Sequence, residues 1–348
     1  MIFTSDNASG AAPEILEALV AAEAGYAMPY GNDPVTERAV ARVRQVFEAP
    51  EAAVYLVATG TAANALALAC LCPPWATVYC HRGSHIEEDE CCAPEFFTGG
   101  AKLTLLGGED AKITEAELRD AIGRTAPHGV HNAQAGALSL TQATEAGAAY
   151  SLDEVRRLAG IARDAGCPVH MDGTRLANAL ARTGASPAEM TWRAGVDVLC
   201  LGATKNGAMA AEAVILFDPE KAWEFELRRK RGGHLFSKMR FVSAQIEAYM
   251  TDGLWLRLAG HANAMADRLA AGLNGAGARV LNAIGANMLF AEITLDQHRR
   301  LQAAGARYYT TSPFDPEGAG DQRIRVRLVA SFRTTGADVD EFVAALAG

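Results

Sequence analysis

Short apolar runs that alternate with helix-forming stretches constrain the fold of this chain more than any other feature of its sequence. The runs cover residues 53–58, 77–80, 102–106, 137–141, 168–171, 196–201 and 213–217. Runs of this length and composition are typical of strands buried on both faces, as in parallel sheets with crossover helices. The sequence therefore predicts an α/β fold with a mainly parallel central sheet.

Helix-start signals between these runs support the alternation. Pro34 follows Asp33, and proline is favoured in the first turn of a helix. Thr114 and Ser151 each stand three residues before a glutamate, which is the capping-box pattern. We expect a helix to begin at each of these three places.

The character of the chain changes beyond about residue 233. Longer helical segments and a β/α/β-like tail are expected at 239–251, 254–273, 288–293, 296–304 and 323–329. We predict a large domain at 1–235, which includes an N-terminal arm at 1–18, and a smaller α+β domain at 236–348.

The charge balance limits the possible partners. The chain has 348 residues, and 32 Lys+Arg against 41 Asp+Glu give it a net charge of −9. Nucleic acids and anionic membranes both require a basic face, so neither is an expected partner. We see no apolar run long enough to span a bilayer and no N-terminal targeting pattern, and we therefore expect a cytoplasmic protein.

Seven cysteines are scattered along the chain without a Cys-x-x-Cys pair or another ligand grouping, so we expect no metal site. Most have apolar neighbours and are predicted to be buried, reduced thiols. Cys91 and Cys92 are adjacent, and we interpret this pair as loop packing rather than as redox chemistry.

Lys205 follows the run 196–201 through Gly-Ala-Thr, which places it at the end of a predicted strand. Most lysines are solvated surface charges. Desolvation among apolar neighbours lowers the pKa of a lysine, however, and the neutral amine can then form a Schiff base. Lys205 is therefore a candidate catalytic lysine.

Asp172 ends the run 168–171, at the strand edge where open α/β sheets bind ligands. It is either a cap of the helix that begins near Leu176 or the buried carboxylate that an enzyme using pyridoxal 5'-phosphate (PLP) needs beside the pyridinium nitrogen. The turn 59–61, Thr-Gly-Thr, is suited to bind a phosphate at a helix N-terminus. Turn, Asp172 and Lys205 occur in the chain order that a PLP site requires.

His85 precedes four acidic residues, 87–90, after the run 77–80. The acidic run is predicted to be a solvated first turn of a helix, stabilised by the helix dipole. His85 is either a structural residue, a ring stacked on the cofactor or a proton carrier.

These motifs together resemble the threonine aldolase/β-eliminating lyase family of fold-type-I PLP enzymes, in particular its low-specificity L-threonine aldolases. The resemblance covers nearly the whole chain and rests on segments 5–7, 30–34, 59–64, 84–87, 170–178, 202–207 and 228–234. It implies an aspartate aminotransferase-like fold, PLP as cofactor, and a homotetramer built as a dimer of dimers with shared active sites.

The resemblance also implies roles for individual residues around the cofactor. Lys205 would be the Schiff-base lysine, Asp172 would lie at the pyridinium nitrogen, and Arg175 would lie at the phenolic oxygen. Gly60 and Thr61 would bind the phosphate, Thr204 would be a further cofactor contact, and His85 would stack on the ring.

Other residues would bind the substrate. The family pattern places the substrate carboxylate against Ser5 and Arg327, where a guanidinium can bind it through two hydrogen bonds. Arg323 and Arg325 would lie on the same strand face as Arg327, so the choice of Arg327 among the three rests on the resemblance. Tyr30, and with it Arg231, is implied at the surface where a neighbouring subunit completes the active site.

His131 falls where the family carries a histidine that helps to remove the proton of the substrate β-hydroxyl. The surrounding segment lacks the proline-containing run expected in the nearest relatives, so His128 competes for this role. His85 is the third candidate base.

The expected reaction is PLP-dependent aldol cleavage of L-threonine, L-allo-threonine and related β-hydroxy-α-amino acids to glycine and an aldehyde, catalysed by a carbon–carbon lyase. The alternative keeps the cofactor but breaks another bond, giving β-elimination, racemisation or transamination. A PLP-binding regulator without catalysis is a third possibility, but no basic helix for binding DNA is visible.

Overall fold

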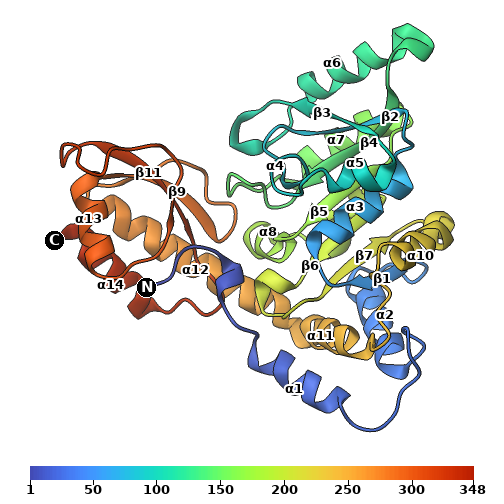
Figure 1. The fold of residues 1–348 in the computed structure, drawn as a ribbon, viewed down its shortest axis with the longest axis horizontal. Coiled ribbons are helices and arrows are strands. Elements are labelled where there is room, and N and C mark those ends of the chain that lie inside the picture. The colour runs from blue at the N-terminus through green and yellow to red at the C-terminus, as the bar shows by residue number, and fades with distance from the viewer.

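The computed structural model describes residues 1–348, except for the side chains of residues 126–128. Figure 1 shows a larger part built on a seven-stranded sheet and a smaller part built on a four-stranded sheet, with α12 (Leu254–Gly275) between them. The predicted fold class, an α/β domain followed by a smaller α+β domain, is confirmed.

The large sheet has the order β1-β7-β6-β5-β4-β2-β3. Its strands are β1 (Ala53–Val57), β2 (Ala76–His81), β3 (Lys102–Leu106), β4 (Gln134–Thr141), β5 (Val169–Gly173), β6 (Val198–Gly202) and β7 (Glu212–Leu216). Strand β7 is antiparallel to both β1 and β6, and all other neighbours are parallel. Each predicted apolar run therefore forms a strand, as expected for a sheet that is buried on both faces.

Helices cover both faces of this sheet (Figure 1). The helices of this part of the chain are α1 (Pro13–Ala22), α2 (Pro34–Val46), α3 (Gly60–Leu71), α4 (His85–Glu88), α5 (Ala93–Thr98), α6 (Glu115–Thr125), α7 (Leu152–Asp164), α8 (Leu176–Thr183), α9 (Pro187–Met190), α10 (Ala222–Arg231) and α11 (Arg240–Met250), and α1 packs on α11 rather than on the sheet. Short 3-10 turns are η1 (Asp6–Ala8), η2 (Glu109–Ala111), η3 (Ala126–His131), η4 (Trp192–Ala194), η5 (Thr204–Asn206), η6 (Pro219–Lys221) and η7 (Thr251–Gly253).

Strand β6 shows how the two faces are divided. Val198 and Cys200 belong to one apolar cluster together with residues of α3 and α10. Leu199 and Leu201 belong to another cluster, together with residues of α7 and α8. Alternate side chains of a strand point to opposite faces, so one short apolar run serves both layers of helices.

The predicted helix starts are confirmed, with one difference in detail. The Asp33 side chain caps α2, and Ser151 and Glu154 form the expected capping box of α7. Thr114 accepts a hydrogen bond from the Glu117 N–H, but the Glu117 carboxylate accepts one from the Gly107 N–H instead of closing the box.

The smaller sheet is antiparallel and has the order β10-β11-β9-β8. Its strands are β8 (Arg279–Val280), β9 (Met288–Thr294), β10 (Tyr309–Thr310) and β11 (Arg323–Val329), accompanied by α13 (Leu295–Ala303) and α14 (Gly336–Ala347). The N-terminal segment joins this part of the molecule. The Phe3 N–H donates to the Arg307 carbonyl, and the Phe3 carbonyl accepts from the Val329 N–H.

Two main apolar cores correspond to the two parts. The core of the larger part extends through α11 to Ala259 in α12, and the core of the smaller part begins at Ala266 in the same helix. A domain boundary after residue 235 stays a prediction, because α12 contributes to both cores.

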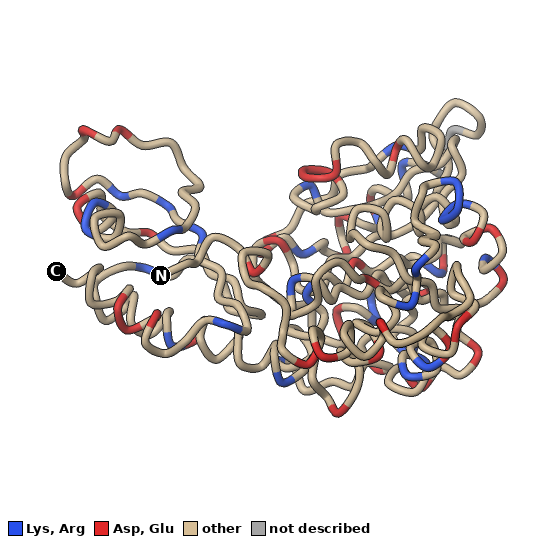
Figure 2. The backbone as a smooth tube through the Cα atoms, turned by 60° about the horizontal axis from the view of Figure 1, so that its bottom comes forward, with Lys and Arg blue, Asp and Glu red and all other residues tan. Residues whose placement is uncertain are grey.

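Charged residues of both signs are interspersed over both parts of the molecule (Figure 2). All seven cysteines are free thiols; Cys91 and Cys92 are exposed and the others are buried. Among the described residues, we find no helix with both the length and the hydropathy needed to cross a membrane.

Candidate active site

A cavity of about 260 Å³ lies at the carboxyl ends of the parallel strands, where open α/β sheets bind their ligands. It is lined by the N-terminus of α3, by η5 after β6 and by the segment after β2. The lining residues are Asn7, Ala58, Thr59, Gly60, Thr61, Asn64, His85, Glu90, Thr174, Thr204, Lys205 and Glu212. The structure thus brings together the predicted lysine, the predicted phosphate turn and one of the predicted histidines.

Lys205 lies in η5, just beyond the end of β6. Burial lowers the pKa of its ammonium, and the positive charge of Arg175 lowers it further, against the opposing effect of Asp6 and Asp172. Because the neutral amine is the nucleophilic form, this environment favours covalent chemistry at Nζ.

Asp172 is buried in β5 and accepts three hydrogen bonds. The backbone N–H and the hydroxyl of Thr174 donate to Oδ1 at 2.9 and 2.6 Å, and Asn64 Nδ2 donates to Oδ2 at 3.0 Å. Burial alone would raise the pKa of Asp172, but these donors outweigh it and lower the pKa. Arg175 occupies the cap position of α8, so the interpretation of Asp172 as a helix cap is wrong.

The turn between β1 and α3 has the form expected of an anion site. Thr59 caps α3 by accepting the Ala62 N–H, and the first two helical residues, Gly60 and Thr61, line the cavity. The N-terminus of a helix of twelve residues attracts negative charge and presents backbone donors to it.

Arg175 forms a buried ion pair with Asp6. The Arg175 Nε and one terminal nitrogen donate to the two Asp6 carboxylate oxygens at 2.8 and 3.0 Å. The sequence did not identify Asp6 as a site residue. Asn287 also donates to Asp6, at 3.1 Å. Burial would raise the pKa of Asp6, but Arg175 and the hydrogen bonds lower it.

The acidic run after His85 is only partly solvated, contrary to the prediction. Glu88 and Asp89 are exposed, but Glu90 is 3 % exposed. His85 Nδ1 and Glu90 Oε1 are 2.8 Å apart, and Asn64 Nδ2 donates to the same oxygen at 2.9 Å. Asn64 thereby bridges Glu90 and Asp172.

Glu145 is a further acid that sequence reasoning missed. Its Oε1 accepts the backbone N–H of His85 at 2.7 Å, and burial raises its pKa to about 7. Glu212, near Lys205, also has a pKa raised by burial to about 7. Glu145 follows the predicted strand 137–141 and Glu212 directly precedes the predicted strand 213–217, but only the tertiary structure shows that Glu212 is buried and Glu145 half-buried.

A model of the β-eliminating lyase family matches residues 3–295. This chain belongs to that family. It is 43% identical over 311 residues to the low-specificity L-threonine aldolase of Pseudomonas aeruginosa, which covers 88% of each chain. It is 40% identical over 309 residues, again 88% of each chain, to the low-specificity L-threonine aldolase of a Pseudomonas species. The predicted resemblance is confirmed, and this member of the β-eliminating lyase family is an enzyme of the carbon–carbon lyase type.

Solved structures agree with this placement. A threonine aldolase of Leishmania major is similar with a TM-score of 0.92 and 26% identity, covering 99% of this chain and 98% of that one. A serine palmitoyltransferase of Sphingomonas wittichii has a TM-score of 0.73 at 14% identity, over 100% of this chain and 86% of that one. This second likeness shows the shared fold alone.

The three predicted substrate contacts lie outside the residues that line the cavity. Arg327, in β11, is half-buried above the Tyr309 ring and donates from Nε to Met288 Sδ at 3.1 Å. Burial lowers the pKa of its guanidinium, and the positive charge of Arg175 lowers it further. Arg323 and Arg325 are exposed, which distinguishes Arg327 from them.

Ser5 accepts the Asn7 N–H and lines a separate cavity near Arg333. Tyr30 is exposed, lines another separate cavity, and has the Lys230 ammonium 5.0 Å from its ring centroid. Within one chain, the structure does not bring Ser5 or Tyr30 to the cavity that contains Lys205.

The structure places His131 away from this site. It is exposed at the end of η3, three residues before β4 begins at Gln134, and so lies near the amino end of that strand. Asp172 and Lys205 lie at the carboxyl ends of β5 and β6, which run parallel to β4. Within one chain, His131 therefore does not line this cavity, and its role as a base stays a prediction. His128 lies outside the described side chains.

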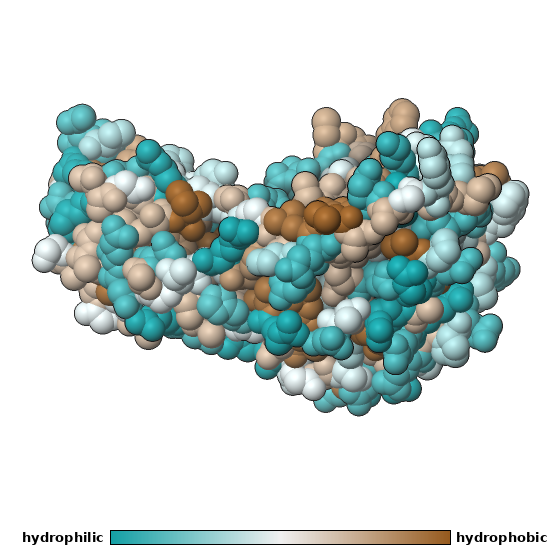
Figure 3. Space-filling view, turned by 90° about the horizontal axis from the view of Figure 1, so that it is seen from below, coloured by the Kyte–Doolittle hydropathy of each residue, from teal (hydrophilic) through white to brown (hydrophobic). Residues whose placement is uncertain are grey.

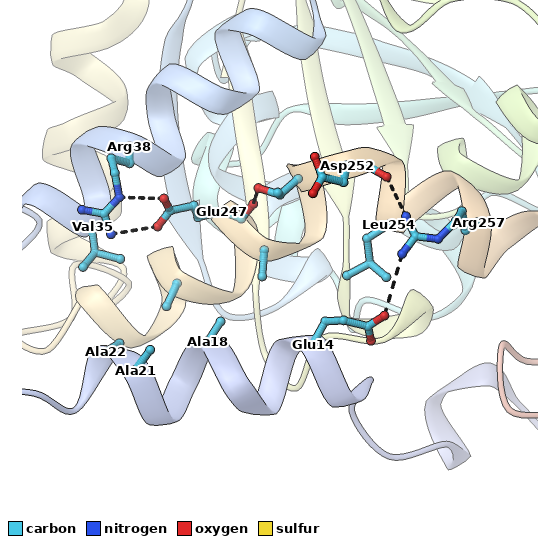
Figure 4. A pocket seen from close by; sticks show the side chains of 13 residues that line it. Glu14, Ala18, Ala21, Ala22, Val35, Arg38, Glu247, Asp252, Leu254 and Arg257 are labelled. Carbon is cyan, nitrogen blue, oxygen red and sulfur yellow. Dashed lines mark hydrogen bonds and ion pairs between the residues drawn. The ribbon is translucent and has the colours of Figure 1, made fainter.

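Another cavity, of about 390 Å³, lies between α1, α2 and α11 (Figure 4). Alanines and a leucine form much of its wall, and the ion pairs Arg38–Glu247 and Arg257–Glu14 lie at its edge. No predicted site residue lines it, so we do not assign the active site there.

Proposed function

We propose that this enzyme uses PLP to cleave L-threonine, L-allo-threonine and related β-hydroxy-α-amino acids to glycine and an aldehyde. The observation that carries this proposal is the single cavity in which Lys205, the N-terminus of α3 and the surroundings of Asp172 meet. The two Pseudomonas relatives, both low-specificity L-threonine aldolases, support the choice of substrate.

The residues of the cavity fit PLP. The backbone donors of Gly60 and Thr61 would hold the phosphate, with Thr204 as a further contact. Asp172 remains ionised despite its burial and would hold a proton on the pyridine nitrogen, and Lys205 would bind the cofactor covalently through Nζ. When bound, PLP withdraws electrons from the substrate Cα, which allows the bond between Cα and Cβ to break.

The chain's own residues would position the substrate and move protons. Arg327 would bind the substrate carboxylate, with Ser5 as a second contact, and Arg175 would lie at the phenolic oxygen of the cofactor while paired with Asp6. His85 would accept the proton of the β-hydroxyl, a contribution of about 10²–10⁴-fold in rate for a well-placed base.

We also propose a cytoplasmic homotetramer, a dimer of dimers in which Tyr30 and Arg231 contribute to the active site of a neighbour. Large apolar side chains on α1 and in the following segment are exposed; they are Leu16, Val20, Tyr26 and Met28. Figure 3 shows hydrophobic side chains gathered on the face of the molecule where α1 lies. Free cysteines are in keeping with a reducing compartment.

The test is incubation of the PLP-loaded enzyme with L-threonine, L-allo-threonine and L-phenylserine. We expect glycine together with the matching aldehyde. Pyruvate and ammonia, or a racemised amino acid, without glycine would instead favour the alternative reactions.

A further inference from the structure

His85 is held at two points by two different acids, the half-buried Glu145 and the buried Glu90. Glu145, which follows β4, accepts the His85 backbone N–H at 2.7 Å. Glu90 binds the imidazole through Nδ1 at 2.8 Å. Within the described part of the chain, His85 Nε2 has no hydrogen-bond partner, and the ring lines the cavity beside Lys205.

We propose that Glu90 is a positioning residue, which keeps the proton of the His85 imidazole on Nδ1 so that Nε2 can accept a proton from the substrate. The proposal rests on the function proposed above, in which His85 is the base. A carboxylate can only accept a hydrogen bond, so an ionised Glu90 fixes which ring nitrogen of a neutral imidazole carries the hydrogen.

The position of the Glu90 side chain is fixed by a second hydrogen bond, from Asn64. Asn64 Nδ2 donates to Glu90 Oε1 at 2.9 Å and to Asp172 Oδ2 at 3.0 Å. One amide therefore joins the acid that orients His85 to the acid proposed at the cofactor nitrogen. Glu90 Oε2 is buried, and no hydrogen-bond partner is found for it among the described residues.

The backbone after Glu90 explains how the side chain returns to His85. Cys91 and Cys92 both have positive φ, at 50° and 59°. Two consecutive left-handed residues turn the chain sharply between α4 and α5, a conformation that L residues seldom adopt. This turn gives the adjacent cysteines a structural role and lets Glu90 point inward while Glu88 and Asp89 remain in solvent.

The electrostatic surroundings make the charge of Glu90 measurable at His85. The hydrogen bond to Glu90 has the largest effect on the pKa of His85, and it raises that pKa. The charge of Asp172 also raises the pKa, whereas burial and the charge of Lys205 lower it. Glu145 faces the His85 backbone N–H rather than the ring. Removal of the Glu90 charge alone must therefore lower the pKa of the imidazole.

The first experiment compares Glu90→Gln and Glu90→Asp with the control Glu88→Gln, which alters an exposed acid two residues away. The pH dependence of kcat/KM is measured for L-threonine cleavage by the PLP-loaded enzymes. The Gln variant keeps an acceptor for Nδ1 but loses the charge. We expect its kcat to fall about 10-fold or more and its acidic limb to move to lower pH.

In Glu90→Asp, the acidic limb of the pH profile should lie between those of Glu90→Gln and the wild type. The profile of the Glu88→Gln control should match that of the wild type. A merely structural Glu90 would lower activity without moving the limb, and this outcome would overturn the proposal. If the wild type cleaves no β-hydroxy amino acid, the proposed function fails, and the effect of Glu90 on His85 is then decided by the second experiment below.

A second experiment does not depend on activity, and its first measurement needs only the wild-type protein. Diethylpyrocarbonate reacts with neutral imidazole, so the pH at which the His85 peptide becomes modified, followed by mass spectrometry, reports its protonation with and without PLP. In the wild type we expect a midpoint above the ordinary value for histidine, moving to lower pH in Glu90→Gln. A His85 midpoint at or below the ordinary value would sink the proposal.

Discussion

Asp6 and Arg175 form a buried, two-point ion pair between residues 169 positions apart in the chain, with N–O distances of 2.8 and 3.0 Å. The acid belongs to η1 near the start of the chain, and the arginine precedes α8 of the larger part. The pair therefore fixes the N-terminal segment against the wall of the proposed active site.

Asp6→Asn should destabilise the protein strongly. The variant leaves a guanidinium buried without a negative partner, which typically costs about 3–5 kcal/mol in the free energy of unfolding. Urea unfolding measures this cost. The control is Asp340→Asn, since Asp340 pairs with Arg268 at the surface and its loss should cost at most about 1 kcal/mol. Equal effects of the two substitutions would contradict a structural role for the buried pair.

Lys205→Ala should keep the fold and lose the chemistry. We expect an unchanged circular dichroism spectrum, no visible absorbance from covalently bound cofactor, and glycine production reduced at least about 10³-fold. Lys238→Ala, at an exposed lysine, is the matched control and should retain both absorbance and activity. Glycine release by Lys205→Ala at the wild-type rate would exclude Lys205 as the cofactor lysine.

Glu212→Gln should make the protein more stable above neutral pH. Burial raises the pKa of Glu212 from 4.5 to about 7. Between these values the folded chain holds a proton that the unfolded chain has released, so the wild type loses stability as the pH rises, by up to about 3 kcal/mol from this group. The gain of the variant over the wild type should therefore grow from pH 4.5 to 7 and then level off.

The matched control for this pH series is Glu220→Gln, at an exposed acid. Its free energy of unfolding should follow the wild type at every pH. A constant difference between Glu212→Gln and the wild type across the series would show that Glu212 ionises normally.

Arg327→Ala should raise the KM for L-threonine. A charge-assisted hydrogen bond contributes about 1.5–3 kcal/mol, which corresponds to an increase of about 10- to 100-fold in KM. Steady-state kinetics with Arg323→Ala provides the comparison, since Arg323 lies on the same face of β11 as Arg327 but is exposed. A similar KM increase in both variants would mean that general positive charge, rather than Arg327, binds the substrate.

The parts of the site that follow strands could be predicted from the sequence. Asp172 and Lys205 each come directly after an apolar run, and parallel strands deliver such residues to one edge of the sheet. The burial of Glu90 could not be predicted in this way. It depends on Asn64, 26 positions earlier, and on a left-handed turn that acidic composition does not reveal.

The position of His131 could not be predicted from the sequence either. Its distance along the chain from Leu140 suited a catalytic histidine, but strand β4 begins at Gln134 and separates His131 from the carboxyl ends of the strands, where the cavity lies. Spacing in sequence does not show at which end of a strand a residue lies. Likewise, Asp6 could be matched to Arg175 only after folding, since no local pattern links them.

The N-terminal segment also has a consequence for the order of events during synthesis. Phe3 is held by Arg307 and Val329, and the Ala12 N–H donates to the Gly207 carbonyl beside the proposed active-site lysine. Residues 3–12 leave the ribosome long before residues 307–329 exist. The seven-stranded sheet can therefore assemble while translation continues, whereas the wall formed by the N-terminal segment has to wait, and a nascent chain that stalls before residue 307 should carry an incomplete site.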